Sequence, residues 1–464
     1  MRSRITLTLA LTVIVVVLIA GSGTPGSNAA LFIQRGDAYR DAYLYTAAVD
    51  QYLQALDRQP DTPILLLRLC DVGLRRGQPD ESTTYADRAE RANADPASVA
   101  ECRARIAAAN GQASESMRQW AIVAAARPAD RAARYRLLDA QIAAHDWPAA
   151  GATAQALLDA DSSDVTASFY VGALLALDDP LHARPYLDHV GTPEAAALVR
   201  ALDDPLSYAS RSYRAVSIGR VFLESDRLPL AWRAFVAATA DAPNYSDAFA
   251  YLGITYERLG DATLAAAFLD RALEINPDSA VAHYLRGVYS SRRKTWDAAR
   301  ADLDRAAQLD AQNAPVALAL GRVLAEQGDF IGAESQLLRA AALEPDNPDG
   351  YLALAEFYIG RLIRVADKGV PAAQRAVDLA PDSAHARDWL GWGLHLMGDH
   401  LAAEIELREA IRLDPMLARA RLHLGNLLVD VGRIEEGRTE LQRAVDLDPA
   451  GEVGSRARQL LGQP

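Results

Sequence analysis

The sequence predicts an all-α solenoid of about twelve antiparallel helix pairs with a C-terminal capping helix. Between Ser212 and Asp448 the chain repeats itself every 34 residues, apart from a two-residue insertion after Phe357. One column of every unit holds glycine or alanine, and proline closes all of these units but one. A period of this length with small residues at fixed columns indicates a helical repeat array.

Each unit contains two apolar-periodic stretches of about 14 residues, each about 21 Å long as a helix. Gly253 and Ala265 are expected to face each other, because two helix backbones approach closely only where the side chains are small. Glycine inside a helix costs about 1 kcal/mol relative to alanine. Its recurrence at the eighth column therefore indicates a steric requirement; that column holds Gly219, Gly253, Gly287, Gly321, Ala355, Gly391 and Gly425.

The N-terminal segment reads as a targeting signal, because Arg2 and Arg4 precede an uncharged apolar run from Ile5 to Ala20. It is either a cleaved signal peptide or a retained anchor through residues 5–20. We favour the anchor, because the apolar core is long for a signal peptide. Both outcomes place the repeats outside the cytoplasm, since the arginines stay inside. Residues 1–28 thus comprise this segment and a short spacer.

The repeats are expected to begin at Ala29, and the early units keep the columns only in part. Pro180 and Pro185 interrupt the fifth unit, and 13 extra residues precede Ser212. We therefore predict a degenerate lobe at 29–198, an irregular connection at 199–211 and a regular array at 212–451. Residues 452–464 are expected to form a capping helix, since terminal repeats expose an apolar face.

The columns resemble those of the tetratricopeptide repeat family, and the match recurs seven times in register. The unit that begins at Ser246 matches at eight positions: Phe249, Leu252, Gly253, Tyr256, Ala265, Leu269, Ala272 and Pro277. The resemblance implies a right-handed superhelix of antiparallel helix pairs. It also implies that the first helices line a concave groove that binds peptides or partner proteins.

The net charge of −13 argues against a nucleic-acid partner, because general phosphate-backbone binding needs a basic surface. The sequence has no phosphate-binding glycine loop, no GxSxG motif and no HExxH motif. Repeats occupy Ala29 to Gly451, so no segment remains for an enzyme domain. We expect no catalytic residue and no cofactor. His385 and His395 fall on different helix faces, so no metal site is expected.

Groove positions are assigned by the resemblance to the first helices, at columns 2, 5, 6, 9, 12 and 13. The chain lacks the Lys/Arg and Asn set with which a subgroup of the family grips chaperone carboxylates. Its groove columns are instead rich in aromatic residues and arginine, which are frequent binding anchors. Packing between repeats is an equal alternative for the tryptophans. The candidates are Tyr213, Arg220, Tyr251, Tyr284, Arg322, His385, Trp389, Trp392, Arg419, His423 and Asn426.

The two cysteines, Cys70 and Cys102, fall at columns 8 and 6 of adjacent first helices. Because those helices pack side by side, a disulfide between neighbouring repeats would form if the chain is exported. The alternative is two buried free thiols.

Two functional hypotheses follow from these patterns. The first is a non-catalytic scaffold that binds protein or peptide partners in its groove, at the extracytoplasmic side of a membrane, for assembly, secretion or an envelope complex. The second is a solenoid that binds a glycan or another non-protein envelope ligand, for which aromatic, arginine and histidine side chains are suited.

Overall fold

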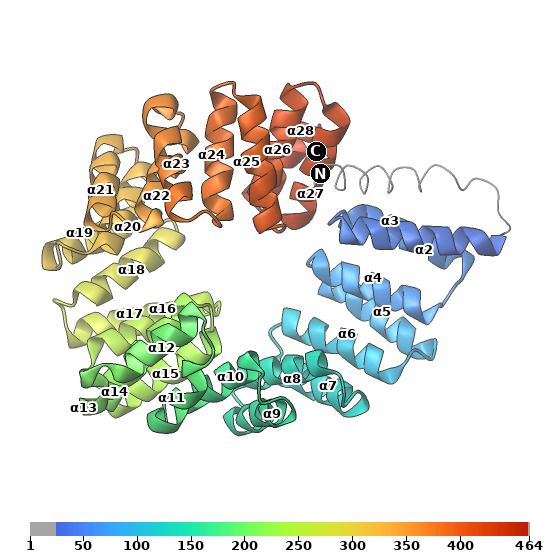
Figure 1. Cartoon of the computed structure of the whole chain (residues 1–464), viewed down its shortest axis with the longest axis horizontal. Helices are drawn as coiled ribbons and strands as arrows, with labels where there is room; N and C mark the ends of the chain where they lie inside the picture. The colour runs from blue at the N-terminus through green and yellow to red at the C-terminus, as the bar shows by residue number, and fades with distance from the viewer. Residues whose placement is uncertain (1–24, 463–464) are drawn as a thin grey trace. The chain divides into compact units, whose positions relative to one another are not determined.

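The computed structural model describes residues 25–462, and every regular element in this range is a helix (Figure 1). The predicted all-α array of antiparallel helix pairs is confirmed. The predicted targeting segment, 1–20, lies outside the described residues. Helix α2 already begins at Pro25, within the predicted spacer. None of the helices in 25–462 combines the length and the apolar character needed to cross a bilayer.

The contacts divide the chain into two units. Unit 1 comprises the described residues up to Ala140 and from Met416 onward, and unit 2 comprises Gln141–Pro415. The helices of unit 1 are α2 (Pro25–Asp41), α3 (Tyr45–Arg58), α4 (Pro63–Arg75), α5 (Pro79–Arg91), α6 (Pro96–Ala109), α7 (Ala113–Ala126), most of α8 (Arg131–Ala143), α26 (Ala418–Asp430), α27 (Ile434–Leu447) and α28 (Glu452–Leu461).

Unit 2 holds the central repeats, including the interrupted fifth one. Its helices are α9 (Trp147–Ala160), α10 (Val165–Leu175), α11 (Pro180–Asp188), α12 (Pro193–Asp203), α13 (Pro205–Ala209), α14 (Arg211–Glu224), α15 (Leu228–Asp241), α16 (Ser246–Arg258), α17 (Ala262–Ile275), α18 (Ala280–Arg292), α19 (Trp296–Leu309), α20 (Ala314–Glu326), α21 (Phe330–Leu343), α22 (Pro348–Gly360), the π-helix η1 (Val365–Gly369), α23 (Val370–Leu379), α24 (Ala384–Leu396) and α25 (His400–Leu413).

Local sequence explains how the two helices of one repeat are separated. Gly260 ends the turn after α16 with a φ of 91°, a left-handed conformation that glycine adopts without steric cost. The next residue, Asp261, caps α17, because its carboxylate accepts a hydrogen bond from the backbone N–H of Leu264. Asp329 and Asp399 cap α21 and α25 in the same way, each after a left-handed glycine.

The glycine column brings the paired helices into close contact, as the sequence predicts. A Cβ atom on Gly253 would lie 2.8 Å from Cγ of Leu269 and 3.0 Å from the carbonyl oxygen of Ala265. Gly287, Gly321, Gly391 and Gly425 meet the equivalent leucine of their own repeat at 2.7 to 2.8 Å. A larger residue at these glycines would therefore displace the facing leucine or push the two helices apart, whereas repeat ten accommodates Ala355 at this column.

The fifth repeat is distorted where its prolines predict a distortion. Its second helix, α11, has nine residues instead of the 14 found in α15 and α17. An additional helix, α12, follows it over 11 residues. The connection 199–211, predicted to be irregular, is mostly helical, because the Asp204 carboxylate accepts from the backbone N–H of Leu206 and starts the short helix α13.

Two further features lie in the C-terminal part of the chain: the two-residue insertion and the last helix. After the two-residue insertion, Leu362 and Arg364 adopt left-handed conformations and the π-helix η1 leads into α23. The last helix, α28, covers α27, and Ala457 of α28 is fully buried beside Leu441. A helix therefore covers the last repeat at the predicted place.

Candidate functional site

The predicted groove residues of repeats six to nine lie on the first helices α14, α16, α18 and α20 of unit 2. The Arg220 guanidinium lies 5.7 Å from the ring centroid of Tyr251, which in turn stacks on Phe235 at 5.3 Å. Burial raises the pKa of Tyr251 to about 12. Arg220 and Tyr251 therefore form a cation–π contact, in which the tyrosine ring is half-buried.

The other members of this set are held by local partners. The Tyr213 hydroxyl donates to Asp204 at 2.9 Å, and this hydrogen bond raises its pKa. The Arg322 guanidinium reaches Glu356 of the next repeat at 3.5 Å. Tyr284 is half-buried, and desolvation raises its pKa. These side chains are polar and aromatic. Their role in binding a partner remains a prediction.

Trp389 belongs to the core of unit 2 and is only 8% exposed. A Cβ atom on Gly360 would lie 3.3 Å from its ring. Trp392 is half-buried, packs against the same core and lies 5.1 Å from the His395 ring. Of the two interpretations left open for Trp389, the structure therefore favours packing between repeats.

The predicted histidines differ in their environments. His385 is exposed on α24, whereas His395 and His423 are buried. The Nδ1 atoms of His395 and His400 lie 3.1 Å apart, a pair that the groove columns do not predict. Arg419 and Asn426 are half-buried on α26, in unit 1. Within 25–462, no three His, Cys, Asp or Glu side chains cluster as metal ligands would.

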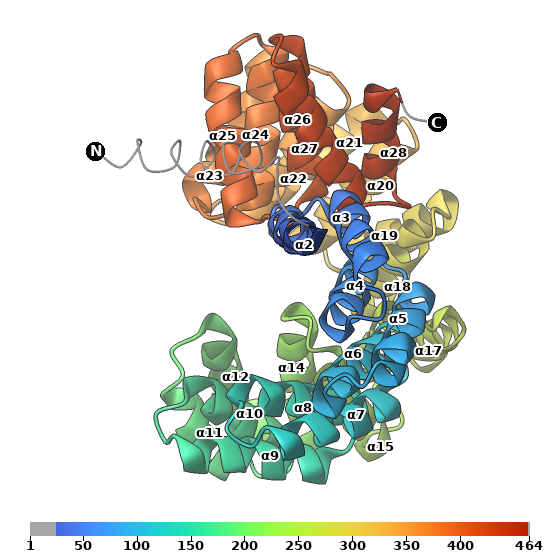
Figure 2. The same cartoon turned by 90° about the vertical axis from the view of Figure 1, so that its right-hand side faces the viewer.

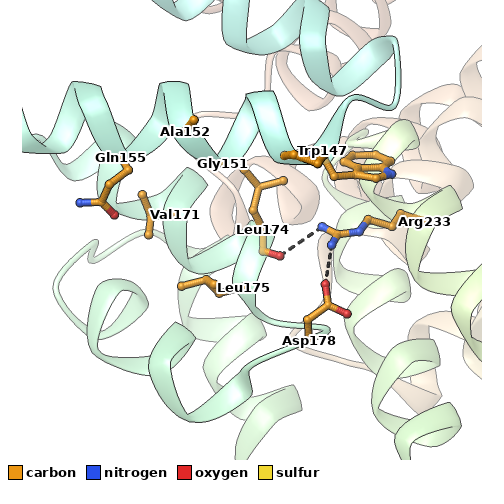
Figure 3. A pocket seen from close by; sticks show the side chains of 10 residues that line it. Trp147, Gly151, Ala152, Gln155, Val171, Leu174, Leu175, Asp178 and Arg233 are labelled. Atoms are coloured by element: carbon orange, nitrogen blue, oxygen red, sulfur yellow. Dashed lines mark hydrogen bonds and ion pairs between the residues drawn. The ribbon is translucent and has the colours of Figure 1, made fainter.

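A pocket that sequence reasoning missed lies beside the distorted fifth repeat, within unit 2 (Figure 3). It has a volume of about 400 Å³, within the range of small-ligand pockets. Helices α9 and α10 form its walls, and Arg233 of α15 reaches into it. The lining residues are Trp147, Pro148, Gly151, Ala152, Gln155, Val171, Leu174, Leu175, Asp178 and Arg233.

Arg233 determines the electrostatics of this pocket. Its guanidinium donates to Asp178 at 2.6 Å and to the carbonyl oxygen of Leu174 at 3.1 Å, as Figure 3 shows. The same group lies 4.9 Å from the centroid of the Trp147 ring. Burial lowers the pKa of Arg233, and the Asp178 charge opposes this shift. The pocket therefore has a paired cation and anion at one side and aliphatic carbon at the other.

A stack of rings positions Trp147. His145 lies 5.5 Å from Trp147 and 4.2 Å from Trp232, with its ring nearly parallel to both. Trp232 of α15 donates from Nε1 to the Tyr256 hydroxyl at 3.0 Å. These contacts join the turn before α9 to the second helix of repeat six, and they hold the aromatic wall of the pocket in place.

The pocket escaped prediction because its residues are not groove positions of first helices. Trp147 and Arg233 lie on second helices, where the family resemblance assigns no binding role. The available signal was the break in the fifth repeat, since Pro180 and Pro185 shorten the helix that packs on α10. The prolines predicted the distortion, but they did not indicate which distant side chains would gather beside it.

The fold and these columns define a helical repeat protein, and comparison with known families identifies the class. The family profile described as tetratricopeptide repeat matches residues 33–97, 216–280, 318–384 and 397–452, slightly more than half of the chain. The chain belongs to the tetratricopeptide repeat family. No curated protein matches it.

Several solved structures are similar to this chain. Yeast Tom70 is 17% identical, with 95% of this chain and 96% of that chain covered and a TM-score of 0.40. PilF of Pseudomonas aeruginosa is 20% identical over 47% of this chain and 98% of its own, with a TM-score of 0.40. A repeat protein of Parabacteroides merdae is 14% identical over 55% of this chain and all of its own, at 0.44. Similarity at this level concerns the fold alone.

Proposed function

We propose that this chain is a non-catalytic scaffold that binds a protein or peptide segment, with the pocket beside Trp147 as an anchoring site. Tetratricopeptide repeat folds generally bind proteins or peptides, and this chain belongs to that family. The observation that carries the proposal is the pocket itself. It combines a Trp wall, aliphatic side chains and a positioned arginine, a combination typical of sites that receive one anchoring side chain.

The chemistry of the lining favours an aliphatic or aromatic side chain as the anchor. Val171 and Leu174 are buried in the wall and leave apolar carbon facing the cavity. Arg233 already donates to Asp178, so the pocket carries little net charge and does not demand a charged ligand. The amide of Gln155 and the Asp178 carboxylate lie at the same site and can bond the backbone of the bound segment.

The proposal includes an extracytoplasmic location, in an assembly, secretion or envelope complex. The apolar run Ile5–Ala20 behind Arg2 and Arg4 supports this location. The cysteine pair supports it as well, because disulfides persist in oxidising compartments. N-terminal peptide mapping and protease accessibility in cells whose cytoplasmic membrane is intact but whose outer envelope is permeabilised test it. Repeats that are digested only after the cytoplasmic membrane is broken would overturn it.

Filling the pocket tests the binding proposal. Ala152 is exposed at column 22 of repeat four, so Ala152→Trp should block the cavity without disturbing the core. Ala267 is exposed at the same column of the regular repeat seven and serves as the matched control. We expect proximity labelling to recover fewer partners from the Ala152→Trp variant than from the native protein. The Ala267→Trp variant should recover the same partners as the native protein. Equal partner sets for the two variants would exclude the pocket as the anchor site.

A glycan ligand is the alternative, because the pocket that Trp147, Gln155 and Asp178 line also suits a sugar ring and its hydroxyls. A glycan array against residues 29–464 separates the two hypotheses. Binding of a defined glycan that Ala152→Trp abolishes and Ala267→Trp retains would favour this alternative over a peptide ligand.

A further inference from the structure

Within unit 1, the first helix pair lies against the last repeat. The Thr46 hydroxyl, at the start of α3, donates to the Asp446 carboxylate of α27 at 3.0 Å, across 400 residues of sequence. Leu447 packs against the apolar core of the first repeat, which contains Tyr45 and Val49. Figures 1 and 2 both show α3 beside α27.

Helix α3 has no N-terminal cap of its own. Its own N-cap position holds Leu44, which cannot accept a hydrogen bond through its side chain, and its first turn has no acidic residue. The first backbone N–H groups of a helix need acceptors and attract negative charge. The Asp446 carboxylate lies at this end, where the backbone N–H groups of Tyr45 and Thr46 favour its charged form.

The Asp446 carboxylate is built into the contact, since only 6% of the residue is exposed. Burial raises its pKa, while hydrogen bonds from Gln442 and Thr46 act in the opposite direction. A buried carboxylate is costly unless it is hydrogen-bonded. The Thr46 hydroxyl and the Gln442 amide both donate to Oδ1 of Asp446, whereas Oδ2 has no hydrogen-bond partner among the described residues.

A second contact lies beside the first. Tyr43, in the turn between α2 and α3, places its ring 5.4 Å from the Arg421 guanidinium of α26. Arg421 is 4% exposed and pairs with Glu440 of α27 at 3.0 Å. The turn before α3 thus meets a cation that the last repeat already holds in a fixed position.

We propose that this contact is an intramolecular latch, in which the last repeat binds the turn Tyr43–Thr46 of its own chain and joins the first repeat to it. The α26–α27 surface is thereby an interaction surface whose partner is the α2–α3 turn. The latch is independent of the proposed partner-binding function. It opens when Asp446 no longer caps α3, and both ends of the array then become accessible.

A distance measurement across the latch tests this proposal. Gln54→Cys in α3 and Arg438→Cys in α27 are exposed positions for spin labels, with Cys70 and Cys102 kept oxidised. Double electron–electron resonance should give one short, narrow distance distribution. Asp446→Ala and the milder Thr46→Val should lengthen and broaden it. Asp446→Asn should preserve it, because asparagine also caps helix N-termini.

The control is Thr83→Val on α5, whose exposed hydroxyl bonds only to its own helix in the described contacts and lies away from the latch. Circular dichroism confirms that each variant is folded. The latch is overturned if the labelled protein without further substitutions shows no short distance between the two labels. It is also overturned if Thr46→Val and Asp446→Ala leave the distribution unchanged, or if dilution with unlabelled protein removes the short distance and so reveals a contact between chains.

Discussion

At the residue scale, the glycine column determines how closely the two helices of a repeat approach. Gly253 leaves no space for a methyl group, whereas a Cβ atom on Gly151 of α9 would have no neighbour within 4 Å. Gly253→Ala should therefore destabilise the protein by about 1–3 kcal/mol through overpacking. Gly151→Ala should stabilise it by about 0.5–1 kcal/mol through helix propensity. Chemical unfolding of both variants checks this; equal effects would contradict the steric account.

His145 is a second residue whose environment has a measurable consequence. Desolvation beside Trp147 and Trp232 lowers its pKa. The folded state therefore favours neutral His145, and the unfolded state takes up a proton near pH 6.5. The stability that the neutral ring contributes is present above about pH 6.5 and is lost as the pH falls through the folded pKa.

His145→Phe keeps a ring in the stack and removes the titration. Any backbone strain that phenylalanine adds at this left-handed position changes the unfolding free energy by the same amount at both pH values. The unfolding free energy of the unmodified protein relative to this variant should therefore be larger at pH 8 than at pH 5.5. If the difference in unfolding free energy between the two proteins did not change with pH, the charge of His145 would have no effect on the stability of the stack.

At the scale of elements, polar pairs replace apolar contacts inside some helix pairs. Asp302 of α19 is 7% exposed and accepts from His283 and twice from Arg286 of α18, each time at 2.8 Å. Arg286 also pairs with the exposed Asp270 of α17 at 3.1 Å. One arginine thus has a buried and an exposed carboxylate partner.

These two partners should differ in their effect on stability. Asp302→Ala removes the buried acceptor of His283 and leaves Arg286 only its exposed partner Asp270, and it should cost about 1.5–3 kcal/mol. Asp270→Ala removes an exposed pair and should cost less than about 1 kcal/mol. Urea unfolding of the two single variants measures both values, and similar losses would mean that the α18–α19 pair does not depend on the buried carboxylate.

The disulfide acts between neighbouring repeats. Cys70 of α4 and Cys102 of α6 are paired in the structure, with their Cα atoms 6.6 Å apart, inside the usual range. Reducing agent should lower the unfolding free energy of the oxidised protein by about 2–4 kcal/mol. The variant Cys70→Ala/Cys102→Ala should not respond to reductant. Free thiols at both positions in protein purified without reductant would refute the bond.

At the scale of the whole molecule, stability depends on the ends of the array, because repeats pack mainly on their sequence neighbours and a terminal repeat has only one. Removal of residues 452–464 uncovers Leu441 and Ala444, which are fully buried with α28 in place. We expect a loss of at least about 2 kcal/mol and increased binding of an apolar dye. Arg456→Ala, an exposed change in the same helix, should have neither effect. An unaltered unfolding curve after truncation would mean that α28 is not a cap.

The repeat length, the helix pairs, the close contact at the glycine column and the place of the distortion could all be predicted from the amino-acid sequence. These features come from neighbours within one or two repeats, and a 34-residue period records such contacts directly. The aromatic and arginine content of the first helices was also visible. Whether Trp389 faced a groove or the core was not, because one column can do either, depending on the neighbouring repeat.

The positions of the pocket and of the latch became visible only in the folded chain. The pocket unites Trp147 with Arg233 across an interrupted repeat, and the latch unites Thr46 with Asp446 across 400 residues. Neither contact follows the 34-residue period, because the pocket joins second helices two repeats apart and the latch joins the first repeat to the last. The columns record how one repeat packs on the next, and contacts between repeats that are not neighbours leave no periodic signal in the sequence.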